Sequence, residues 1–358
     1  MNIFSNLMGG GGDRLSNIEA LRLLSMLMVL NLHSFWGYDY GDGIGQAFDF
    51  FRESSSICAV NVFLLISGYF GIKWKWKSFY NLVFQIFFYS FGVYLIACGI
   101  GVVDFSLKGF LSNVPCTYSH YSFVKHYLLL YFFAPILNAF VEKCSNKKLF
   151  IFIILLIICE NFISRGNKFS NYCVMYLIGR WLKGIQFKEI LIVNPVMSYC
   201  LVTTLIALLS YLFYLFTPIN TAELMCNFIF GYDYSAPLVI LQAVFLFLAF
   251  SRLRFTSKFI NWCASSCLAI FLIHSHPSIR WIGYYNITES FYNLPIWQHS
   301  IYLILLIIVV FFGSILIDKI RIIISDYVYI LIEKLLSIIP SKYLSIDTYI
   351  PKSVNKII

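Results

Sequence analysis

Long hydrophobic runs recur along almost the whole of this 358-residue sequence and constrain its fold more than any other feature. A helix that crosses a bilayer needs about 20 mostly apolar residues, and it satisfies its own backbone hydrogen bonds. Ten such segments are expected, and three of them, 56–72, 149–164 and 169–184, are short enough to be tilted, kinked or partly interfacial. The others are 17–36, 78–101, 122–141, 190–216, 235–251, 262–283 and 296–318.

The overall composition supports this interpretation. Hydrophobic residues make up 60% of the chain and charged residues only 12%, with a mean hydropathy of +0.79, whereas soluble domains are about 25% charged. The sequence therefore predicts an all-α polytopic membrane protein without a sizeable soluble domain. The formal net charge of +9 does not indicate nucleic-acid binding, because the basic residues fall in short loops between the runs.

Loop charge orients the segments, because the cytoplasmic loops of membrane proteins are rich in Lys and Arg. Basic and acidic connections alternate consistently across all ten segments, so both termini are expected in the cytoplasm. The basic side carries Arg14, Lys73, Lys75, Lys77, Lys143, Lys147, Lys148, Lys183, Lys188, Arg252, Arg254, Lys258, Lys319, Arg321, Lys334, Lys342, Lys352 and Lys356. The acidic side carries Asp39, Asp42, Asp49, Glu53, Asp104, Glu223, Asp233 and Glu289.

The residues after 318 follow a different pattern. About Arg321 to Ile339 has the pattern of an amphipathic helix ended by Pro340, and we expect it to lie along the inner membrane surface. The chain therefore divides into a membrane domain, 1–318, and a cytoplasmic amphipathic tail, 319–358.

The first segment carries two ionisable residues, Arg22 and His33, eleven positions apart. Eleven residues are close to three helical turns, so both side chains lie on one face, about 16 Å apart along the axis. Glu19 precedes Arg22 by three residues and can pair with it. Arg22 alone could be a snorkelling anchor, and His33 alone an interfacial polar residue. Their shared face favours a function, with Arg22 near the cytoplasm and His33 as a general base in the outer half.

The second segment contains Asn61 and Ser67-Gly68, and Lys73-Trp74-Lys75-Trp76-Lys77 follows it. Asn61 needs a hydrogen-bond partner in its apolar run, and Ser67-Gly68 permits close helix approach. Lys and Trp are typical of the cytoplasmic interface. The same cations and indoles could instead bind a phosphorylated ligand that carries an aromatic base.

Histidines mark the outer ends of two later segments. His274, His276 and Arg280 cluster near the end of the ninth segment, and His126 lies near the start of the fourth. We expect them to orient groups at an outward-facing polar pocket. No metal site is expected, because His274 and His276 have no acidic ligand nearby in the sequence.

These motifs, in this order, resemble the acyltransferase-3 family of integral membrane acyltransferases, and most closely its bacterial polysaccharide O-acetyltransferase branch. The first helix of that family carries Arg, ten residues, then His, as Arg22 and His33 do. Family signatures are also similar to Asn17–Arg22, Val62–Tyr69, Leu130-Tyr131 with Pro135 and Asn138, and Ile270–His274 with Pro277 and Arg280. A Trp common near Ser122 is missing, and His126 and His276 are atypical, so the resemblance says least about the acceptor side.

The resemblance implies a multi-pass enzyme of the bacterial inner membrane. It would transfer an acyl group, usually acetyl from acetyl-CoA, to a hydroxyl of a surface polysaccharide. The expected partners are acetyl-CoA, a carbohydrate acceptor that is free or lipid-linked, and the lipid bilayer, with no nucleic acid and no bound cofactor. The expected catalytic residues are His33, Arg22 and Glu19; the donor-binding residues are Arg22, Lys73, Lys75, Lys77, Trp74, Trp76 and Ser67; and the acceptor or orienting residues are Asn61, His274, Arg280 and His126.

Alternatives remain open at this point. Direct transfer and an acyl-histidine intermediate are both compatible with His33. A transporter or flippase of lipid-linked glycan would need broken midplane helices and preferably internal repeats, and no such repeat is apparent. A glycan polymerase would favour a large outer loop with acceptor-binding arginines, but the longest outer loops, about 37–55 and 102–121, carry only Arg52 and Lys108 clear of the helices.

Overall fold

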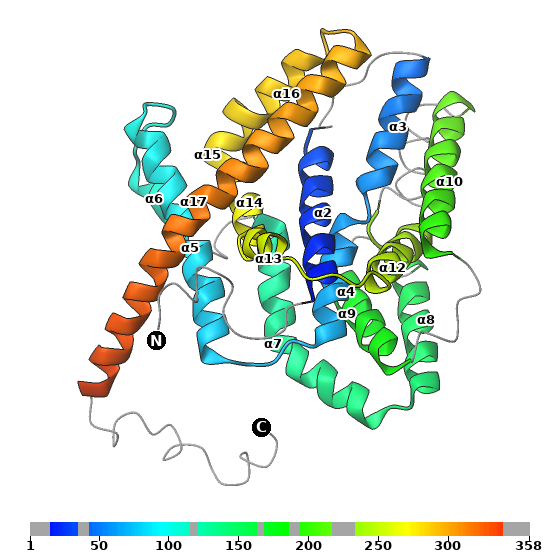
Figure 1. The fold of residues 1–358 in the computed structure, drawn as a ribbon, viewed down its shortest axis with the longest axis horizontal. Helices are drawn as coiled ribbons and strands as arrows, with labels where there is room; N and C mark the ends of the chain where they lie inside the picture. Colours follow the sequence, from blue (N-terminus) through cyan, green and yellow to red (C-terminus); the bar gives the residue numbers. More distant parts are fainter. Residues whose placement is uncertain are drawn as a thin grey trace.

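The computed structural model describes residues 15–34, 43–114, 121–162, 168–185, 194–216 and 233–338. Helices joined by short connections fill these ranges, and no strand occurs in them, so the predicted all-α class is confirmed. All ten expected segments overlap a helix. Figure 1 shows a bundle of helices crossed by one much longer helix, α17.

The helices follow one another with few long connections among the described residues. They are α2 (Ser16–Leu32), α3 (Ile44–Ser56), α4 (Ala59–Phe70), α5 (Trp76–Gly99), α6 (Leu107–Ser112), α7 (Ser122–Lys143), α8 (Asn146–Phe162), α9 (Lys168–Gly184), α10 (Pro195–Phe216), α12 (Pro237–Ser251), α13 (Lys258–Ala264), α14 (Cys267–His274), α15 (Pro277–Ile279), the π-helix η4 (Arg280–Tyr285), α16 (Asn286–Phe291) and α17 (Ile296–Ile338).

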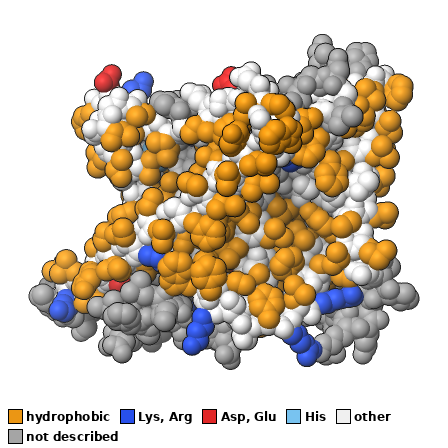
Figure 2. All heavy atoms as spheres, turned by 45° about the horizontal axis from the view of Figure 1, so that its top comes forward, with side chains coloured by type: hydrophobic (Ala, Val, Ile, Leu, Met, Phe, Trp, Pro, Cys, Tyr) orange, Lys and Arg blue, Asp and Glu red, His pale blue; other side chains and the backbone are white. Residues whose placement is uncertain are grey.

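Several of these helices have the length and hydropathy of membrane spans. Within the described residues the long apolar stretches are Gly45–Phe70, Trp76–Gly99, Ser122–Lys143, Pro195–Phe216 and Ile296–Ile332, and Pro237–Ser251 and Lys258–His274 are shorter apolar stretches. Figure 2 shows apolar side chains over most of the visible face, with most of the visible Lys and Arg in its lower part. A surface this apolar is suited to lipid rather than to water. The chain is a multi-pass membrane protein.

The second crossing begins earlier than the predicted segment 56–72. α3 and α4 form one apolar stretch, Gly45–Phe70, so the predicted outer loop 37–55 is helical from residue 44. The sequence placed Arg52 clear of the helices, but the residue is buried within α3. The prediction was wrong because Asp49, Arg52 and Glu53 lower the hydropathy of this helix, while Arg52 and Asp49 form an ion pair at 3.0 Å.

The ninth segment is broken rather than continuous over 262–283. α13 ends at Ala264, α14 ends at His274, and the chain restarts at Pro277 and continues into η4. Proline has no N–H to donate and suits the first position of a new helix. The break places His274 and Ser275 at a helix end, where their side chains can meet residues of other helices.

α17 differs from the prediction of a membrane helix followed by a separate surface helix. Residues 321–338 are helical as expected, but they continue a single helix of 43 residues. Such a helix is about 64 Å long, roughly twice the hydrocarbon thickness of a bilayer. The proposed boundary between a membrane domain and a tail at 318 therefore falls inside one element, and Pro340 lies outside the described residues.

Two predicted loop cations of the tail, Lys319 and Arg321, are in fact buried. Lys319 Nζ donates to the Trp262 carbonyl oxygen at 2.6 Å and to Ser265 Oγ at 2.8 Å. Arg321 Nε donates to Asp318 Oδ1 at 2.8 Å. Lys319 therefore joins α17 to the end of α13, and Arg321 pairs within α17, so neither marks a loop.

The closest helix contact in the core joins α4 to α9. A Cβ added to Gly68 would lie 2.1 Å from the Tyr176 carbonyl oxygen, and one added to Gly179 would lie 2.3 Å from the Leu65 carbonyl oxygen. Only glycine allows the two backbones to approach so closely, which confirms the interpretation of Ser67-Gly68 as a close-contact motif. α2 lies beside this pair, in the middle of the bundle, and packs against α3, α4, α12, α13 and α14 (Figure 1).

Candidate active site

His33 lies where α2 ends, and polar contacts fix it there. Its backbone N–H donates to the Val29 carbonyl oxygen at 3.0 Å. The next residue, Ser34, donates through Oγ to the Asn31 carbonyl oxygen at 2.6 Å, and Asn31 Nδ2 donates to Ser56 Oγ at 2.8 Å. The end of α2 is thereby tied to the end of α3.

His33 forms a hydrogen bond with His274, 241 positions later in the chain, with 2.8 Å between Nδ1 of His33 and Nε2 of His274. Nδ1 of His274 lies 2.6 Å from the Ile270 carbonyl oxygen. A carbonyl oxygen can only accept, so this Nδ1 carries the proton, and in a neutral ring Nε2 is then the acceptor. His33 consequently donates through Nδ1, and its Nε2 keeps a free lone pair; these tautomers are assigned from the hydrogen bonds.

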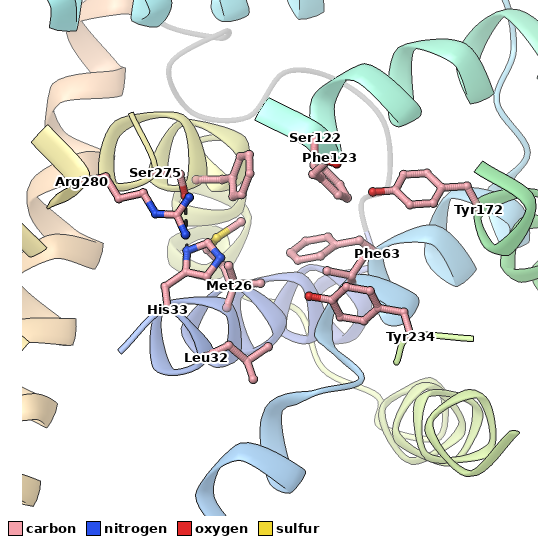
Figure 3. A pocket seen from close by; sticks show the side chains of 13 residues that line it. Met26, Leu32, His33, Phe63, Ser122, Phe123, Tyr172, Tyr234, Ser275 and Arg280 are labelled. Carbon is pink, nitrogen blue, oxygen red and sulfur yellow. Dashed lines mark hydrogen bonds between the residues drawn. The ribbon is translucent and has the colours of Figure 1, made fainter. Parts of the chain in front are cut away.

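A cavity of about 230 Å³ borders His33 (Figure 3). One wall is the face of α2 that carries Met26, Val29 and His33, which is also the face of Arg22 one turn earlier. The remaining lining residues are Leu32, Val60, Phe63, Ser122, Phe123, Tyr172, Tyr234, Phe271, Ser275 and Arg280. Mostly apolar walls, with Ser275 and Arg280 beside His33, suit a small acyl group that reacts at one end (Figure 3).

The polar end of the cavity also holds Ser275 and Arg280. Ser275 Oγ lies 3.1 Å from His274 Nε2 and 3.4 Å from His33 Nδ1. Arg280 donates through Nε to the Tyr285 hydroxyl, and its guanidinium carbon lies 4.8 Å from the Tyr285 ring centroid. Arg280 begins a π-helix, a form that is frequent at functional sites. A guanidinium at this place can stabilise an oxyanion that develops near His33.

Arg22 pairs with Glu19 as predicted, at 3.1 Å between Nη1 and Oε1. The Glu19 carboxylate is buried, whereas the Arg22 side chain is 35% exposed. Arg22 is not among the lining residues of the His33 cavity, because it lies one turn of α2 before Met26. Its contact with a donor phosphate stays a prediction.

The segment Lys73–Lys77 follows α4 and is exposed. The Trp74 ring packs against Tyr131 at 5.4 Å between centroids, and the 58% exposed Trp76 lies 6.2 Å from Phe79. Lys77 Nζ lies 5.1 Å from the ring of Tyr329 on α17. These contacts place the segment at an exposed aromatic surface, and its donor-binding role stays a prediction.

Ser67 lies one helical turn from the cavity on α4. Its Oγ donates to the carbonyl oxygen of Phe63, a lining residue, at 2.9 Å. The same Oγ lies 3.3 Å from the Tyr127 hydroxyl on α7. Ser67 is thus positioned between the cavity and the segment Lys73–Lys77.

Asn61 and His126 stand behind the cavity wall rather than on it. Asn61 Nδ2 donates to the Tyr234 carbonyl oxygen at 2.7 Å, and Asn61 Oδ1 accepts from Asn171 Nδ2 at 3.1 Å. His126 Nδ1 lies 2.6 Å from the Ser122 carbonyl oxygen. Tyr234 and Ser122 are both lining residues, so Asn61 and His126 support the wall indirectly.

The two histidines of the late motif serve different partners. His274 faces His33, whereas His276 Nε2 lies 3.0 Å from the Ser90 carbonyl oxygen and its Nδ1 accepts from the Ser278 N–H at 3.2 Å. Across the described residues, no group of three His, Cys, Asp or Glu side chains is arranged to hold a metal ion.

The aromatic walls of the cavity were not predicted. Phe63 and Phe271 lie inside the motifs noted above and Phe123 lies near the start of the fourth segment, but in a chain with 19% aromatic residues nothing distinguishes them. Tyr172 and Tyr234 lie outside every motif. Burial raises the pKa of Tyr234, so its hydroxyl stays protonated and can donate a hydrogen bond.

Arg52 was also missed, because the sequence placed it in a loop. Its Nη2 donates to Asp49 Oδ1 at 3.0 Å and to the Tyr292 hydroxyl at 2.9 Å. Its Nη1 donates to Ser34 Oγ at 3.2 Å. Arg52 therefore braces the residue that follows His33 against α3 and the end of α16.

Comparison with known proteins agrees with this geometry. The acyltransferase-3 family model, described as an acyltransferase domain, matches residues 15–319. Neither the curated proteins nor the solved structures gave a match. The matched region is most of the chain and contains His33, His274 and the whole lining of the cavity. The chain belongs to the acyltransferase-3 family and is a membrane acyltransferase.

Proposed function

We propose that this protein is a membrane O-acetyltransferase that moves an acetyl group from cytoplasmic acetyl-CoA to a hydroxyl of a cell-surface or exported polysaccharide. Its place would be the bacterial inner membrane. The observation that carries the proposal is the His33–His274 hydrogen bond at the edge of an apolar cavity. It leaves one imidazole nitrogen of His33 free to accept a proton, as a general base must.

The reaction needs a hydroxyl to lose its proton while its oxygen attacks a thioester. Nε2 of His33 takes the proton as the sugar oxygen bonds to the carbonyl carbon. The C–S bond then breaks, the acetyl group stays on the sugar oxygen, and the sulfur of CoA leaves with the proton returned by His33. His274 accepts the Nδ1–H bond of His33 throughout and holds the ring in the tautomer that the reaction requires.

Two further groups support this reaction. Arg280 carries a positive charge at the polar end of the cavity, where the carbonyl oxygen of the thioester becomes negative during attack. The apolar side chains of Met26, Val29 and Phe271 would surround the acetyl methyl group and exclude water from the thioester. Arg22, about 16 Å from His33 along α2, would meet the donor from the cytoplasmic side.

The test compares the O-acetyl content of the host's surface glycan in cells that carry the wild-type gene, no gene, or the variants His33→Ala and Arg22→Ala. All proteins must be present in the membrane at the same level. We expect the glycan to be made in every strain, with its base-labile acetate lost without the gene and in both variants. Normal acetylation by His33→Ala would refute the proposal. Loss of the whole glycan from the surface would instead identify a transporter or flippase.

A further inference from the structure

Three lines of residues run from the cavity towards the predicted cytoplasmic ends of α4, α7 and α9. On each helix, residues at one-turn spacing follow a residue that lines the cavity, and we call these residues the ladder. Its members are Phe63, Ser67 and Gly71 with α4, Phe123, Tyr127 and Tyr131 on α7, and Tyr172, Tyr176 and Arg180 on α9. None of the α9 members belongs to a motif noted in the sequence.

Side-chain contacts connect the ladder residues within α7 and between helices. The Phe123 and Tyr127 rings stack at 5.8 Å, and the Tyr127 hydroxyl lies 3.3 Å from Ser67 Oγ. One turn further, the Tyr176 hydroxyl accepts from the Ile72 N–H at 2.9 Å. The ladder thus begins at the cavity with the rings of Phe63, Phe123 and Tyr172 and carries further hydroxyl groups towards the cytoplasm.

The ladder ends at Arg180, beside Gly71. Gly71 has φ +75, which favours glycine, and a Cβ there would lie 2.7 Å from Arg180 Nη1. Asn138 Nδ2 donates to the Ile72 carbonyl oxygen at 3.0 Å and fixes the chain just before the segment Lys73–Lys77. The Arg180 guanidinium therefore packs against the backbone of Gly71, just before the segment Lys73–Lys77.

Arg180 differs from three other arginines inside the bundle. Arg22, Arg52 and Arg321 pair with carboxylates at 3.1, 3.0 and 2.8 Å. For Arg180, which is partly buried, no carboxylate among the described residues forms an ion pair and Nε has no hydrogen-bond partner. A partly buried cation without a counter-charge is unfavourable, and a bound anion would remove that cost.

A second orphan group lies close to the same end of the ladder. Tyr131 is 6% exposed, and its hydroxyl has no hydrogen-bond partner in the part of the chain that the structure describes. Its ring packs against Trp74 at 5.4 Å. A buried hydroxyl is normally satisfied, so an additional polar ligand is expected between Tyr131 and the basic segment.

We propose that Arg180 binds a phosphate group of the acyl donor, whose thioester arm follows the ladder to the cavity. This inference rests on the proposed function. Arg180 lies eight positions after Tyr172 at the cavity, about 12 Å along the axis of α9, which the pantetheine arm of the donor can span. Lys73 and Lys75, exposed just beyond Gly71, add positive charge around the same phosphates.

The test measures equilibrium binding of acetyl-CoA and of S-acetyl-pantetheine, which lacks the nucleotide, to the purified full-length protein in bilayer nanodiscs. We expect Arg180→Ala to weaken acetyl-CoA binding by about tenfold or more and to leave S-acetyl-pantetheine binding unchanged. Arg180→Lys should recover part of the affinity. Lys183→Ala, which removes an exposed cation from the same helix, is the matched control and should bind both compounds as the wild type does.

Each other outcome is decisive. Wild-type affinity of Arg180→Ala for acetyl-CoA overturns the inference while the proposed function stands. If Arg180→Ala weakens the binding of acetyl-CoA and of S-acetyl-pantetheine equally, the role of Arg180 is purely structural and the inference is also overturned. If Arg180→Ala does not fold, Arg180→Lys is compared with Lys183→Ala in the same way. If the wild-type protein does not bind acetyl-CoA, the proposed donor itself is wrong.

A lipid headgroup carries the same phosphate chemistry, so the bilayer is varied as well. Binding is measured in nanodiscs of phosphatidylcholine alone and with phosphatidylglycerol added. The inference predicts that the wild type binds acetyl-CoA more tightly than Arg180→Ala also in phosphatidylcholine alone. A ratio near one there, with anionic lipid retained by the wild type but not by Arg180→Ala, would assign the site to lipid and refute the inference.

Discussion

Two polar clusters lie inside the helix bundle, and their polar atoms face different surroundings. In the Asp318 cluster, Oδ1 of Asp318 accepts from the Tyr89 hydroxyl at 2.8 Å and from Gln85 Nε2 at 3.4 Å, and Arg321 donates to both carboxylate oxygens at 2.8 and 3.0 Å. In the His33 cluster, the hydrogen bonds run from His33 to His274 and on to a backbone carbonyl, and the outer nitrogen of His33 faces a cavity.

The difference separates a structural cluster from a chemical one. Every oxygen of the Asp318 carboxylate has a donor, and the residue is completely buried, so the cluster can hold α17 against α5 but has nothing left to offer a substrate. The His33 cluster ends on an unused acceptor next to a space that a small molecule can fill. A buried polar group alone does not indicate a site; an unsatisfied one that borders a cavity does.

Removing the unpaired acceptor of the His33 cluster, Nε2 of His33, should have the largest effect on acetyl transfer. His33→Ala deletes the proposed general base, and we expect the rate of acetyl transfer from acetyl-CoA to fall by about 10²- to 10⁴-fold. The measurement is release of CoA thiol in proteoliposomes supplied with the glycan acceptor. Because His33 is only partly buried, thermal unfolding should be nearly unchanged. A variant that unfolds early would show that His33 belongs with the structural cluster.

Breaking the Asp318 cluster should affect stability instead. Asp318→Ala leaves Arg321 buried without its counter-charge, and we expect a loss of about 3–5 kcal/mol in the free energy of unfolding. Thermal unfolding of the purified protein in detergent measures the change. The double variant Asp318→Leu/Arg321→Met, which removes both charges, should recover most of the loss. A catalytic defect in the double variant at wild-type stability would contradict the comparison.

His274→Gln tests the second histidine of the His33 cluster. The variant removes the imidazole acceptor that holds the His33 tautomer, and we expect transfer to slow by roughly 10- to 100-fold, as for partners that orient metal-bound imidazoles. The same thiol-release assay gives the value. A defect as large as that of His33→Ala would mean that His274 is itself the base.

Ser275→Ala should have the smallest effect. Its hydroxyl lies 3.1 Å from His274 Nε2, but His33 already donates to that nitrogen at 2.8 Å. Loss of one neutral hydrogen bond corresponds to roughly a threefold to tenfold slower transfer. A larger loss, measured at saturating donor, would place Ser275 in contact with the reacting groups.

Much of the fold and part of the site could be predicted from local patterns. The hydrophobic runs gave helices at all ten expected segments, the spacing of Glu19, Arg22 and His33 gave their common face, and Ser67-Gly68 gave a close helix contact. Charge content misled the prediction twice. Arg52 and Arg321 were assigned to loops or to a surface tail, although each is buried beside a carboxylate three residues away.

The sequence by itself determined that this chain is a helical membrane protein with an Arg22–His33 face, because helix periodicity and hydropathy depend on residues close together in the chain. The tertiary structure alone decided that His274 becomes the partner of His33 across 241 positions, that aromatic residues from α4, α7, α9 and α14 close the cavity, and that Arg180 ends without a described counter-charge. These facts depend on how distant helices pack, and such packing leaves no periodic signal in the sequence.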